Sequence, residues 1–286
     1  MDEAGEGIRM TRIPECPLLP DEGTLLGPLP CGVVGDDASR ILGVTKYEPP
    51  VPLAWRGECV HLPGWTVPYD IRSARRHPGV IGIGEPVEIT EKLHGTMCAV
   101  GYFKDVCIAD TLLIGGDTIV YSKGLGETGH VLKASNQGNL YIRAAIDHGL
   151  RERLRAAFNG RPATAFGEIY GKGVQDLAYG KGAPSFALFD IYLGVPGRGR
   201  WLNRKEFGSV SGEIAATAPA LYAGPLRAGI VQQLASGSTV AGNMAHLREG
   251  IVIRPAEERN HPRIGRTILK YVSHEYLTRA CGTEFH

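Results

Sequence analysis

The chain has 286 residues, of which 43% are hydrophobic and 21% charged, so it is long enough for one large or two small globular domains. Its formal net charge is only +1, which counts mildly against a module that binds nucleic acid through overall charge, although a local basic face can coexist with a neutral total. No apolar run reaches the ~18 residues that span a bilayer, and the acidic residues 1–10 lack the apolar centre of a secretory signal, so we expect no membrane association.

Six cysteines and nine histidines are scattered along the chain without the spacing of a metal site. No two cysteines form a C-x-x-C pair, and no histidines form an H-E-x-x-H pair. Scattered cysteines are typical of a reduced compartment. We therefore predict a cytoplasmic protein without a disulfide framework or a zinc site.

The N-terminal part of the chain predicts irregular structure, because residues 1–40 are rich in proline and glycine. Pro49, Pro50 and Pro52 then mark a linker, since each proline disfavours helix in the residue before it. The expected division is an N-terminal irregular segment with its linker at residues 1–52 and a main domain at residues 53–286.

The stretch DIRSARRHP at residues 70–78 predicts a short helix. Asp70 would be its N-cap, and Pro78 would end it. Its three arginines would form either a basic surface or merely a solvated helix face, and the sequence leaves both readings open.

The stretch VEITEKLHGTMCAVGY at residues 87–102 places Lys92 where a strand ends. Apolar and polar residues alternate over residues 87–90, the pattern of a half-buried strand, and a glycine turn follows before a second apolar run begins at Met97. A lysine at such a strand end can be held over a pocket. It is a nucleophile only as the neutral amine, so its pKa must fall by about 3 units from about 10.4, through burial or a nearby cation.

Strand-like runs follow at residues 97–102, 106–114 and 117–122, with a hairpin turn at residues 115–117. Residues 124–129, GLGETG, formally match G-x-G-x-x-G. The segment after them is too short and too polar for the helix of a dinucleotide fold, so we predict a mobile loop instead.

In the second half of the chain, apolar residues at helical spacing predict a helix over residues 140–158 despite Gly149, and Pro225 predicts the start of another helix. Strands outnumber long helices and do not alternate regularly with them. This pattern favours an α+β domain with antiparallel sheets. The remaining expected elements are strands at 164–170, 185–193, 250–254 and 266–273 and helices near 203–216 and 224–235.

Several short motifs follow the EKLHGT segment around Lys92 in a fixed order: SKG at 122–124, FGEIYG at 166–171, FALFDI at 186–191, EGIVI at 249–253 and LK at 269–270. In that order they resemble the six motifs of covalent nucleotidyltransferases, the polynucleotide ligases and mRNA capping enzymes. EKLHGT, GEIYG followed by VQDLAYG, and FDIYL look most like ATP-dependent RNA ligases, and within these the bacterial, Deinococcus-type branch. The resemblance covers about residues 40 to 280.

The resemblance implies a fold and a domain plan. It implies an α+β nucleotidyltransferase (ATP-grasp-like) domain of antiparallel sheets flanked by helices. Relatives carry a complete OB-like module upstream, and here only its last segment, ending at residues 42–52, resembles theirs. Residues 1–52 would then be the remnant of an OB-like module.

The resemblance also assigns catalytic roles. Lys92 would attack the α-phosphate of ATP and form lysyl-AMP, Lys123 would contact the phosphates of the nucleotide and of the RNA 5′ end, and Lys270 would neutralise the α-phosphate. Glu168 would accept a hydrogen bond from the ribose; a surface salt bridge is the alternative, which its apolar and glycine neighbours in FGEIYG weaken. Glu249, with Glu168, would hold Mg²⁺ or Mn²⁺, which keeps most of its water ligands.

The nucleotide-binding set implied by the resemblance is Glu91, Lys92, Leu93, Gly95, Lys123, Glu168, Phe189, Glu249 and Lys270. Phe189 would stack on adenine, although an aromatic residue in a strand is usually part of the core. His94 would orient Lys92 or a metal-bound water, or be a structural histidine.

Two departures from the related phage-type RNA ligases bear on the final sealing step. Those ligases have a second lysine two residues after the position of Lys270, where this chain has Val272, and an asparagine where it has Met97. We therefore expect efficient self-adenylylation and slow sealing.

Other functions are compatible with parts of the pattern. A capping guanylyltransferase or a DNA ligase would normally have an OB domain after the last motif, and only residues 271–286 follow it here. A ligase-like adenylyltransferase with a small-molecule acceptor, or a weakly active nucleotide-binding relative, is the alternative from another class. The expected partners are ATP and RNA ends or a nicked duplex, and the expected state is a monomer engaged in RNA repair.

Overall fold

The computed structural model describes residues 58–62, 64–124 and 129–279. All of them lie within one unit of the chain, residues 51–286. The predicted N-terminal segment, residues 1–52, and most of the predicted mobile loop at 124–129 lie outside the described residues.

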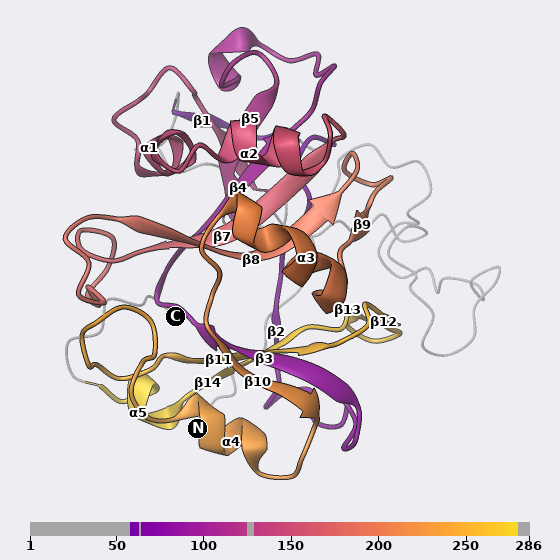
Figure 1. Cartoon of the computed structure of the whole chain (residues 1–286), viewed down its shortest axis with the longest axis vertical. Coiled ribbons are helices and arrows are strands. Elements are labelled where there is room, and N and C mark those ends of the chain that lie inside the picture. The colour runs from indigo at the N-terminus through magenta and orange to yellow at the C-terminus, as the bar shows by residue number, and fades with distance from the viewer. Residues whose placement is uncertain (1–57, 63, 125–128, 280–286) are drawn as a thin grey trace, which may run out of the picture. The chain divides into compact units, whose positions relative to one another are not determined.

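The larger of the two main sheets is fully antiparallel (Figure 1). Its central pair, β4 and β7, is largely buried, and strands buried on both faces need apolar side chains on both sides. In order across the sheet, the seven strands are β1 (Cys59–Val60), β6 (His130–Leu132), β5 (Thr118–Ser122), β4 (Gly95–Tyr102), β7 (Ala163–Tyr170), β8 (Ser185–Leu193) and β9 (Arg200–Trp201).

The second sheet has five strands, and only its edge pair, β14 with β2, is parallel. In order across this sheet they are β10 (Ala220–Pro225), β3 (Pro86–Lys92), β11 (Gly250–Pro255), β14 (Leu269–Val272) and β2 (Arg72–Ser73). A separate short hairpin pairs β12 (Asn260–His261) with β13 (Gly265–Arg266). The predicted α+β class with antiparallel sheets is confirmed.

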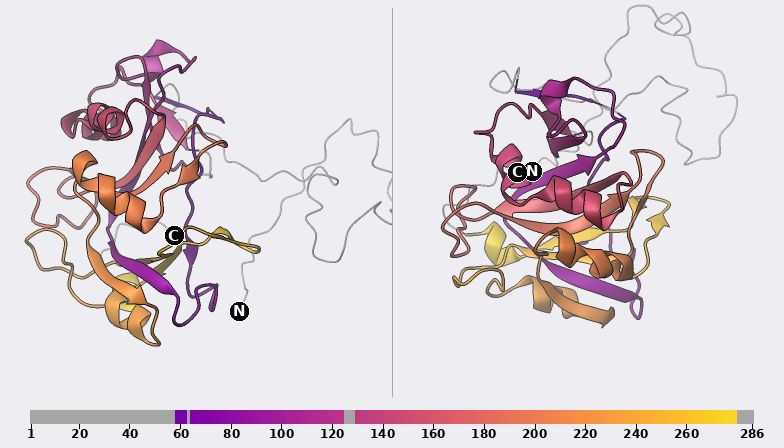
Figure 2. Two further views of the ribbon diagram at one scale, coloured as in Figure 1. Left: turned by 45° about the vertical axis from the view of Figure 1, so that its right-hand side comes forward. Right: turned by 45° about the horizontal axis from the view of Figure 1, so that its top comes forward.

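Helices cover the outer faces of both sheets (Figures 1 and 2). The helices are α1 (Leu140–Asp147), α2 (Leu150–Ala157), α3 (Arg204–Ile214), α4 (Ile230–Ala235) and α5 (His274–Leu277), with the 3-10 helix η2 (Asp110–Leu112). Helices α1, α2 and α3 pack Ile142, Leu154 and Phe207 against the seven-stranded sheet, and α4 packs on the five-stranded sheet. Each fully buried side chain of this size contributes roughly 1.5–3 kcal/mol.

The inner faces of the two sheets pack against each other and form a second core. Phe166 and Tyr121 from the larger sheet, both fully buried, meet Val252 of β11 and Ile268. The two sheets are therefore separate layers held by an apolar interface, with strand ends from both layers available to build a site beside it.

The chain passes from one sheet to the other between β3 and β4, and only Leu93 and His94 join these strands. Gly95 begins β4, and a Cβ atom there would lie 2.1 Å from the carbonyl oxygen of Ile169. Only glycine permits so close an approach of β4 to β7. Lys92 consequently lies at the point where the two sheets diverge.

Two predicted elements are wrong in type. Residues 70–78 form β2 and a turn instead of a helix, because β2 finds a parallel partner in β14, and Asp70 binds Lys123 instead of capping a helix. Residues 106–114 contain η2 instead of a strand, since Leu112 and Leu113 are buried in the inter-sheet core. The predicted turn at 115–117 is confirmed by the bridge between Ile114 and Thr118.

Three further predictions are wrong in their limits. The predicted helix at 140–158 is two helices, α1 and α2, because Gly149 takes φ of 58° between them. The predicted helix at 224–235 begins only at Ile230, and Pro225 instead ends β10, an edge strand where its missing N–H costs no ladder bond. The predicted final strand divides into β13 and β14.

Candidate active site

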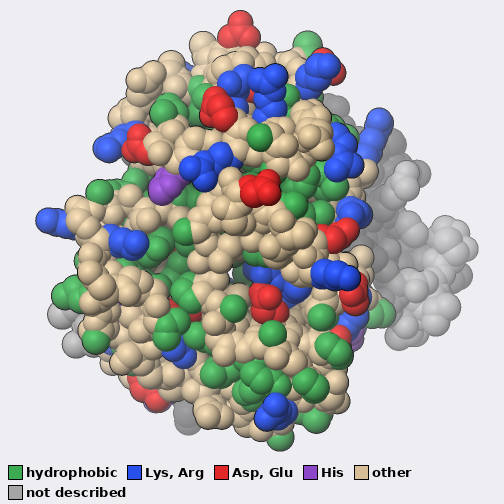
Figure 3. Space-filling model, in the orientation of Figure 1, with side chains coloured by type: hydrophobic (Ala, Val, Ile, Leu, Met, Phe, Trp, Pro, Cys, Tyr) green, Lys and Arg blue, Asp and Glu red, His purple; other side chains and the backbone are tan. Residues whose placement is uncertain are grey.

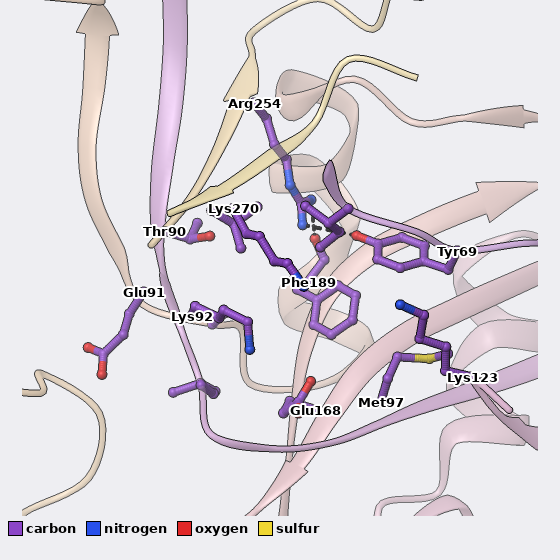
Figure 4. A pocket seen from close by; sticks show the side chains of 14 residues that line it. Tyr69, Thr90, Glu91, Lys92, Met97, Lys123, Glu168, Phe189, Arg254 and Lys270 are labelled. Carbon is purple, nitrogen blue, oxygen red and sulfur yellow. Dashed lines mark hydrogen bonds between the residues drawn. The ribbon is translucent and has the colours of Figure 1, made fainter. Parts of the chain in front are cut away.

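A pocket opens between the two sheets, and most of the predicted site residues line it (Figure 4). Its lining residues are Tyr69, Ile71, Thr90, Glu91, Lys92, Leu93, Met97, Lys123, Glu168, Phe189, Ala218, Val252, Arg254 and Lys270. Of the predicted residues, only Gly95 and Glu249 are not among them; Glu249 forms an ion pair with the lining residue Lys92, and Gly95 lies against the lining residue Glu168. The motifs that are far apart in the sequence therefore come together at one site.

Lys92, at the end of β3, forms an ion pair with Glu249, which directly precedes β11. The pairing of β3 with β11 places Lys92 opposite Gly250 and so brings the two side chains together. The Glu249 side chain is only 1% exposed and that of Lys92 is 24% exposed. A carboxylate this buried needs a cation beside it, and either Lys92 or a divalent metal can be that cation.

Three lysines converge on the pocket, since Lys123 follows β5 and Lys270 lies on β14 (Figure 4). Burial lowers the pKa of Lys270, and the nearby cations Lys92 and Lys123 lower it further. Such a cluster of ammonium groups is unfavourable until an anion joins it. It is therefore suited to bind phosphate.

Asp70 holds Lys123 at the pocket, with 3.0 Å between its carboxylate and the Lys123 ammonium. It also pairs with Arg72 at 3.2 Å. Partial burial tends to raise the pKa of Asp70, but the Lys123 and Arg72 cations keep it below its ordinary value. Sequence reasoning missed this role because Asp70 matched the pattern of a helix N-cap.

Glu168 lies in the middle of β7, directly opposite Met97 of β4, and both side chains line the pocket. Glu168 thus belongs to the pocket wall instead of the outer surface. The thioether of Met97 occupies the neighbouring part of the wall, at the position where the sequence departs from phage-type RNA ligases.

The ring of Phe189, from the neighbouring strand β8 of the same sheet, forms a further part of the wall (Figure 4). It is only half-buried, and its ring centroid lies 5.4 Å from that of Tyr69. The carbonyl of Phe189 accepts hydrogen bonds from Arg254 at 2.5 Å and from Arg204 at 3.4 Å. The backbone below the ring is therefore fixed, while the ring keeps an open face.

A buried network of charges lies behind Phe189 and joins the two sheets. Asp190 of β8 is fully buried and binds Arg266 at 2.7 Å, Arg254 of β11 at 3.4 Å and the hydroxyl of Tyr69 at 2.9 Å. Burial alone would raise the pKa of Asp190, but the two arginines hold it below its ordinary value. Sequence reasoning missed Arg254, although a lone cation in the apolar strand GIVIRP was a signal.

The side chain of Glu91 points away from the three lysines (Figure 4). Side chains alternate along a strand, so Thr90 and Lys92 face the pocket and Glu91 faces the other side. There it accepts hydrogen bonds from the hydroxyl of Thr239 and from the amide of Val240 at 2.9 Å, and it lies 3.6 Å from Arg248. These contacts give the Glu91 side chain a structural role, and a contact of this residue with nucleotide stays a prediction.

The carboxylates near the lysines fit a divalent metal that is also bound by water and by the phosphates of a nucleotide. Among the described residues, no group of three or more His, Cys, Asp or Glu side chains could hold a metal ion on its own. Glu168 and Glu249 supply hard oxygen donors, and Mg²⁺ usually takes one or two carboxylates together with water and substrate phosphates.

None of the helices in the described residues is long and apolar enough to cross a membrane.

Comparisons with known proteins agree with this geometry. A family model described as RNA ligase matches residues 85–272, which contain all of the predicted site residues. Similar solved structures include an RNA ligase of Naegleria gruberi with pyrophosphate, a point mutant of it with ATP and Mn, and another with AMP and Mn. Each has a TM-score of 0.61 and 25% identity and covers 85% of this chain, which in turn covers 66–67% of each of them. Comparison with curated protein sequences gave no match.

Proposed function

Because the chain belongs to the RNA ligase family, we propose that it forms a lysyl-AMP from ATP on Lys92, transfers the AMP to an RNA 5′-phosphate and seals that end to a 3′-hydroxyl. The observation that carries this proposal is the meeting of Lys92, Lys123 and Lys270 in one pocket with the open ring of Phe189. A nucleotide needs both parts of such a site, cations for its phosphates and an aromatic face for its base.

In the first step, the Nζ atom of Lys92 attacks the α-phosphorus of ATP. The N–P bond forms, the bond to the bridging oxygen breaks, and pyrophosphate leaves. Lys92 must first give up its proton, because only the neutral amine is a nucleophile. Glu249 fixes the direction of the Lys92 side chain through their ion pair.

In the second step, an oxygen of the RNA 5′-phosphate attacks the phosphorus of lysyl-AMP, and Lys92 leaves as the amine. In the third step, the 3′-hydroxyl attacks the 5′-phosphate, loses its proton, and AMP leaves. Lys123 and Lys270 are placed to stabilise the negative charge that develops on the phosphorus centres.

Glu168 and Glu249 are the residues that would hold Mg²⁺ or Mn²⁺. The metal would supply positive charge for the triphosphate and the leaving group. The Naegleria gruberi RNA ligase structures with ATP and Mn support this part of the proposal.

The finer parts of the assignment have separate supports. The EKLHGT, VQDLAYG and FDIYL segments support the Deinococcus-type branch, with residues 1–52 as the remnant of an OB-like module and 53–286 as the catalytic domain. We also propose that the enzyme is a monomer that acts in RNA repair in the cytoplasm, since scattered cysteines are typical of a reduced compartment.

The direct test is incubation with α-labelled ATP and Mg²⁺, followed by a denaturing gel. The label should remain on the protein, be released by acid as expected of a phosphoramidate, and be far weaker with labelled GTP. The Lys92→Ala variant should carry no label. Persistent labelling of that variant would exclude Lys92 as the nucleophile.

The alternative acceptor, a small molecule, is favoured by the net charge of only +1, which offers little overall attraction to RNA. Labelled RNA with a 5′-phosphate, annealed at a nick beside a 3′-hydroxyl RNA, distinguishes the two functions. A ligase passes AMP to the RNA. Because this chain has Met97 and Val272 where phage-type RNA ligases have asparagine and lysine, it should seal the RNA slowly, and adenylylated RNA should accumulate. Lysyl-AMP that never passes AMP to any RNA end would favour the small acceptor.

A further inference from the structure

The loop between β7 and β8, residues 171–184, has a composition that the proposed chemistry does not explain. Two Gly-Lys-Gly tripeptides, at 171–173 and 180–182, flank the segment VQDLAY. Gly171, Gly173 and Gly180 all have positive φ angles, between 67° and 106°. The loop therefore has a special backbone conformation at both of its ends, with a lysine at each.

The inner side of this loop holds the turn that follows Lys92. The Gln175 amide donates to the carbonyl of Gly95, the Asp176 carboxylate lies 2.5 Å from Nε2 of His94, and the Tyr179 hydroxyl accepts from the His94 amide at 2.7 Å. Three residues of one loop thus bind the two residues that determine where the backbone goes after the nucleophile.

Tyr179 is held in a conformation that a tyrosine rarely adopts, with φ of 53°. Its ring packs edge-on against Tyr170 and His246, with centroids 5.1 and 4.3 Å away. A Cβ atom at Gly242 would lie 1.9 Å from the Tyr179 carbonyl oxygen, so the backbone of the 236–247 segment closes against it. The surroundings maintain this strained residue, which keeps its hydroxyl on His94.

His94 is fixed from its other side by helix α5, where the Tyr276 hydroxyl lies 2.6 Å from Nδ1. Both His94 and Tyr276 are buried. A neutral ring that donates from Nε2 to Asp176 and accepts at Nδ1 from Tyr276 satisfies every group. Arg279 pairs with Asp176 at 3.3 Å and completes the connection between loop and helix.

The outer side of the loop is cationic. Asp176 is the only acidic residue among residues 171–184, and its carboxylate is turned inward to His94 and Arg279. Lys172 is exposed and Lys181 is half-exposed, and the glycines beside them carry no side chain that would cover the backbone. Figure 3 shows Lys and Arg side chains projecting at the left edge of the molecule, where Figure 1 places this loop.

We propose that the β7–β8 loop binds the phosphate backbone of the RNA strand through its two Gly-Lys-Gly tripeptides while Gln175, Asp176 and Tyr179 hold the nucleophile turn. This inference rests on the proposed function, because the RNA must come to Lys92 to accept AMP. Lysines and bare glycine amides are common partners of phosphate. One loop then both positions the nucleophile and receives the RNA.

The outer contact is tested with the double variant Lys172→Ala/Lys181→Ala. The matched control is Lys104→Ala/Lys205→Ala, which removes two exposed lysines elsewhere. Each lysyl-AMP enzyme is isolated, and transfer of AMP to a single-stranded 5′-phosphate RNA is followed in single turnover between 50 and 200 mM salt. Losing two phosphate contacts should make the slope of log affinity against log salt shallower by about 1.4, or about sevenfold across this range.

The inner contact is tested with Tyr179→Phe and Asp176→Asn. Lysyl-AMP should form about tenfold more slowly while KM for ATP stays the same, because these side chains orient the turn without touching nucleotide. Asp176→Glu should recover part of the rate. A change in KM alone, or no change in rate, would overturn the positioning role.

The outcomes separate this inference from the proposed function. If the wild-type lysyl-AMP never passes AMP to RNA, the ligase assignment itself fails. If the wild type transfers AMP and both lysine double variants show the wild-type salt slope, the ligase stands and the RNA contact of the loop is excluded.

Discussion

Two clusters of charge in this molecule differ in burial and in how their charges are matched. In the pocket, Lys92 and Lys123 are 24% and 45% exposed, and each has a carboxylate partner that a phosphate or metal can replace. Behind the pocket, Asp190 is fully buried between Arg254 and Arg266, and it also accepts from Tyr69. The first cluster is arranged to exchange partners and the second to join two sheets, so removing a charge should change activity in one and stability in the other.

The largest effect is expected for Asp190→Ala. Removing one partner of a buried ion pair leaves the arginines uncompensated and costs about 3–5 kcal/mol, so the melting temperature should fall by roughly 5–15 °C. Because the arginines lower the pKa of Asp190, the stability it contributes is present above about pH 4, the ordinary carboxyl value, and is lost only as the pH falls through the lowered value. A melting temperature within 2 °C of wild type at pH 7 would contradict the structural role.

Glu249→Gln should reverse this pattern. The variant keeps the shape of the side chain and loses the charge that orients Lys92 and would bind metal, so lysyl-AMP formation should slow by about 10²–10³. The melting temperature should change little, since Lys92 can still reach solvent. The melting temperatures of Glu249→Gln and Asp190→Ala should be measured together. If Glu249→Gln lost as much stability as Asp190→Ala, both clusters would have a structural role and the distinction between them would fail.

Phe189→Ala should weaken the use of ATP by roughly 1–3 kcal/mol, because a base loses its stacking partner. Phe189→Trp should be tolerated better, since it keeps an aromatic face. The measurement is KM for ATP in lysyl-AMP formation. Equal KM values for wild type and the alanine variant would assign Phe189 to the core alone.

Asp70→Asn should have the smallest effect, because a partly exposed ion pair is worth about 0–1 kcal/mol. Lys123 would no longer be held at the pocket, so KM for ATP should rise, by less than about fivefold. Asp70 also raises the pKa of Lys270, which burial and the other lysines lower. Its loss should lower that pKa further and move the alkaline decline of the reaction to lower pH. An unchanged pH profile would show that Asp70 does not influence Lys270.

The difference between the two clusters also explains what could be predicted from the sequence. The pocket lysines and glutamates lie in short motifs whose order and spacing are visible in one chain, so all of them were expected near one site. The Asp190 network depends on Arg254 and Arg266, and only the packing of the sheets brings those strands to β8. Asp190, Arg254 and Arg266 lie in separate segments of the sequence, so no short motif predicts their contact.

The errors had a similar origin. Residues 70–78 have good helix signals, but β14, about 200 residues later, offers them a strand partner, and tertiary pairing overrides local propensity. The resemblance places Glu91 in the nucleotide-binding set, but alternation along β3 turns its side chain to the face opposite Lys92. The strand pattern alone predicts that direction.

The strand order also determines when the site can first exist during synthesis. Strand β4 finds its partner β5 almost at once, whereas β3 pairs with β10 and β11, which are both made late in the chain. At ordinary elongation rates, the ribosome adds the roughly 160 residues from β3 to β11 in about 10–30 s. Until β10 is made, roughly 130 residues after β3, the strand with Lys92 has neither of its two sheet neighbours, and an unpaired strand edge can pair with other chains. The residues that complete the sheet around Lys92 are thus among the last to be made, and the catalytic lysine gains its fixed position only when β10 and β11 have both joined β3.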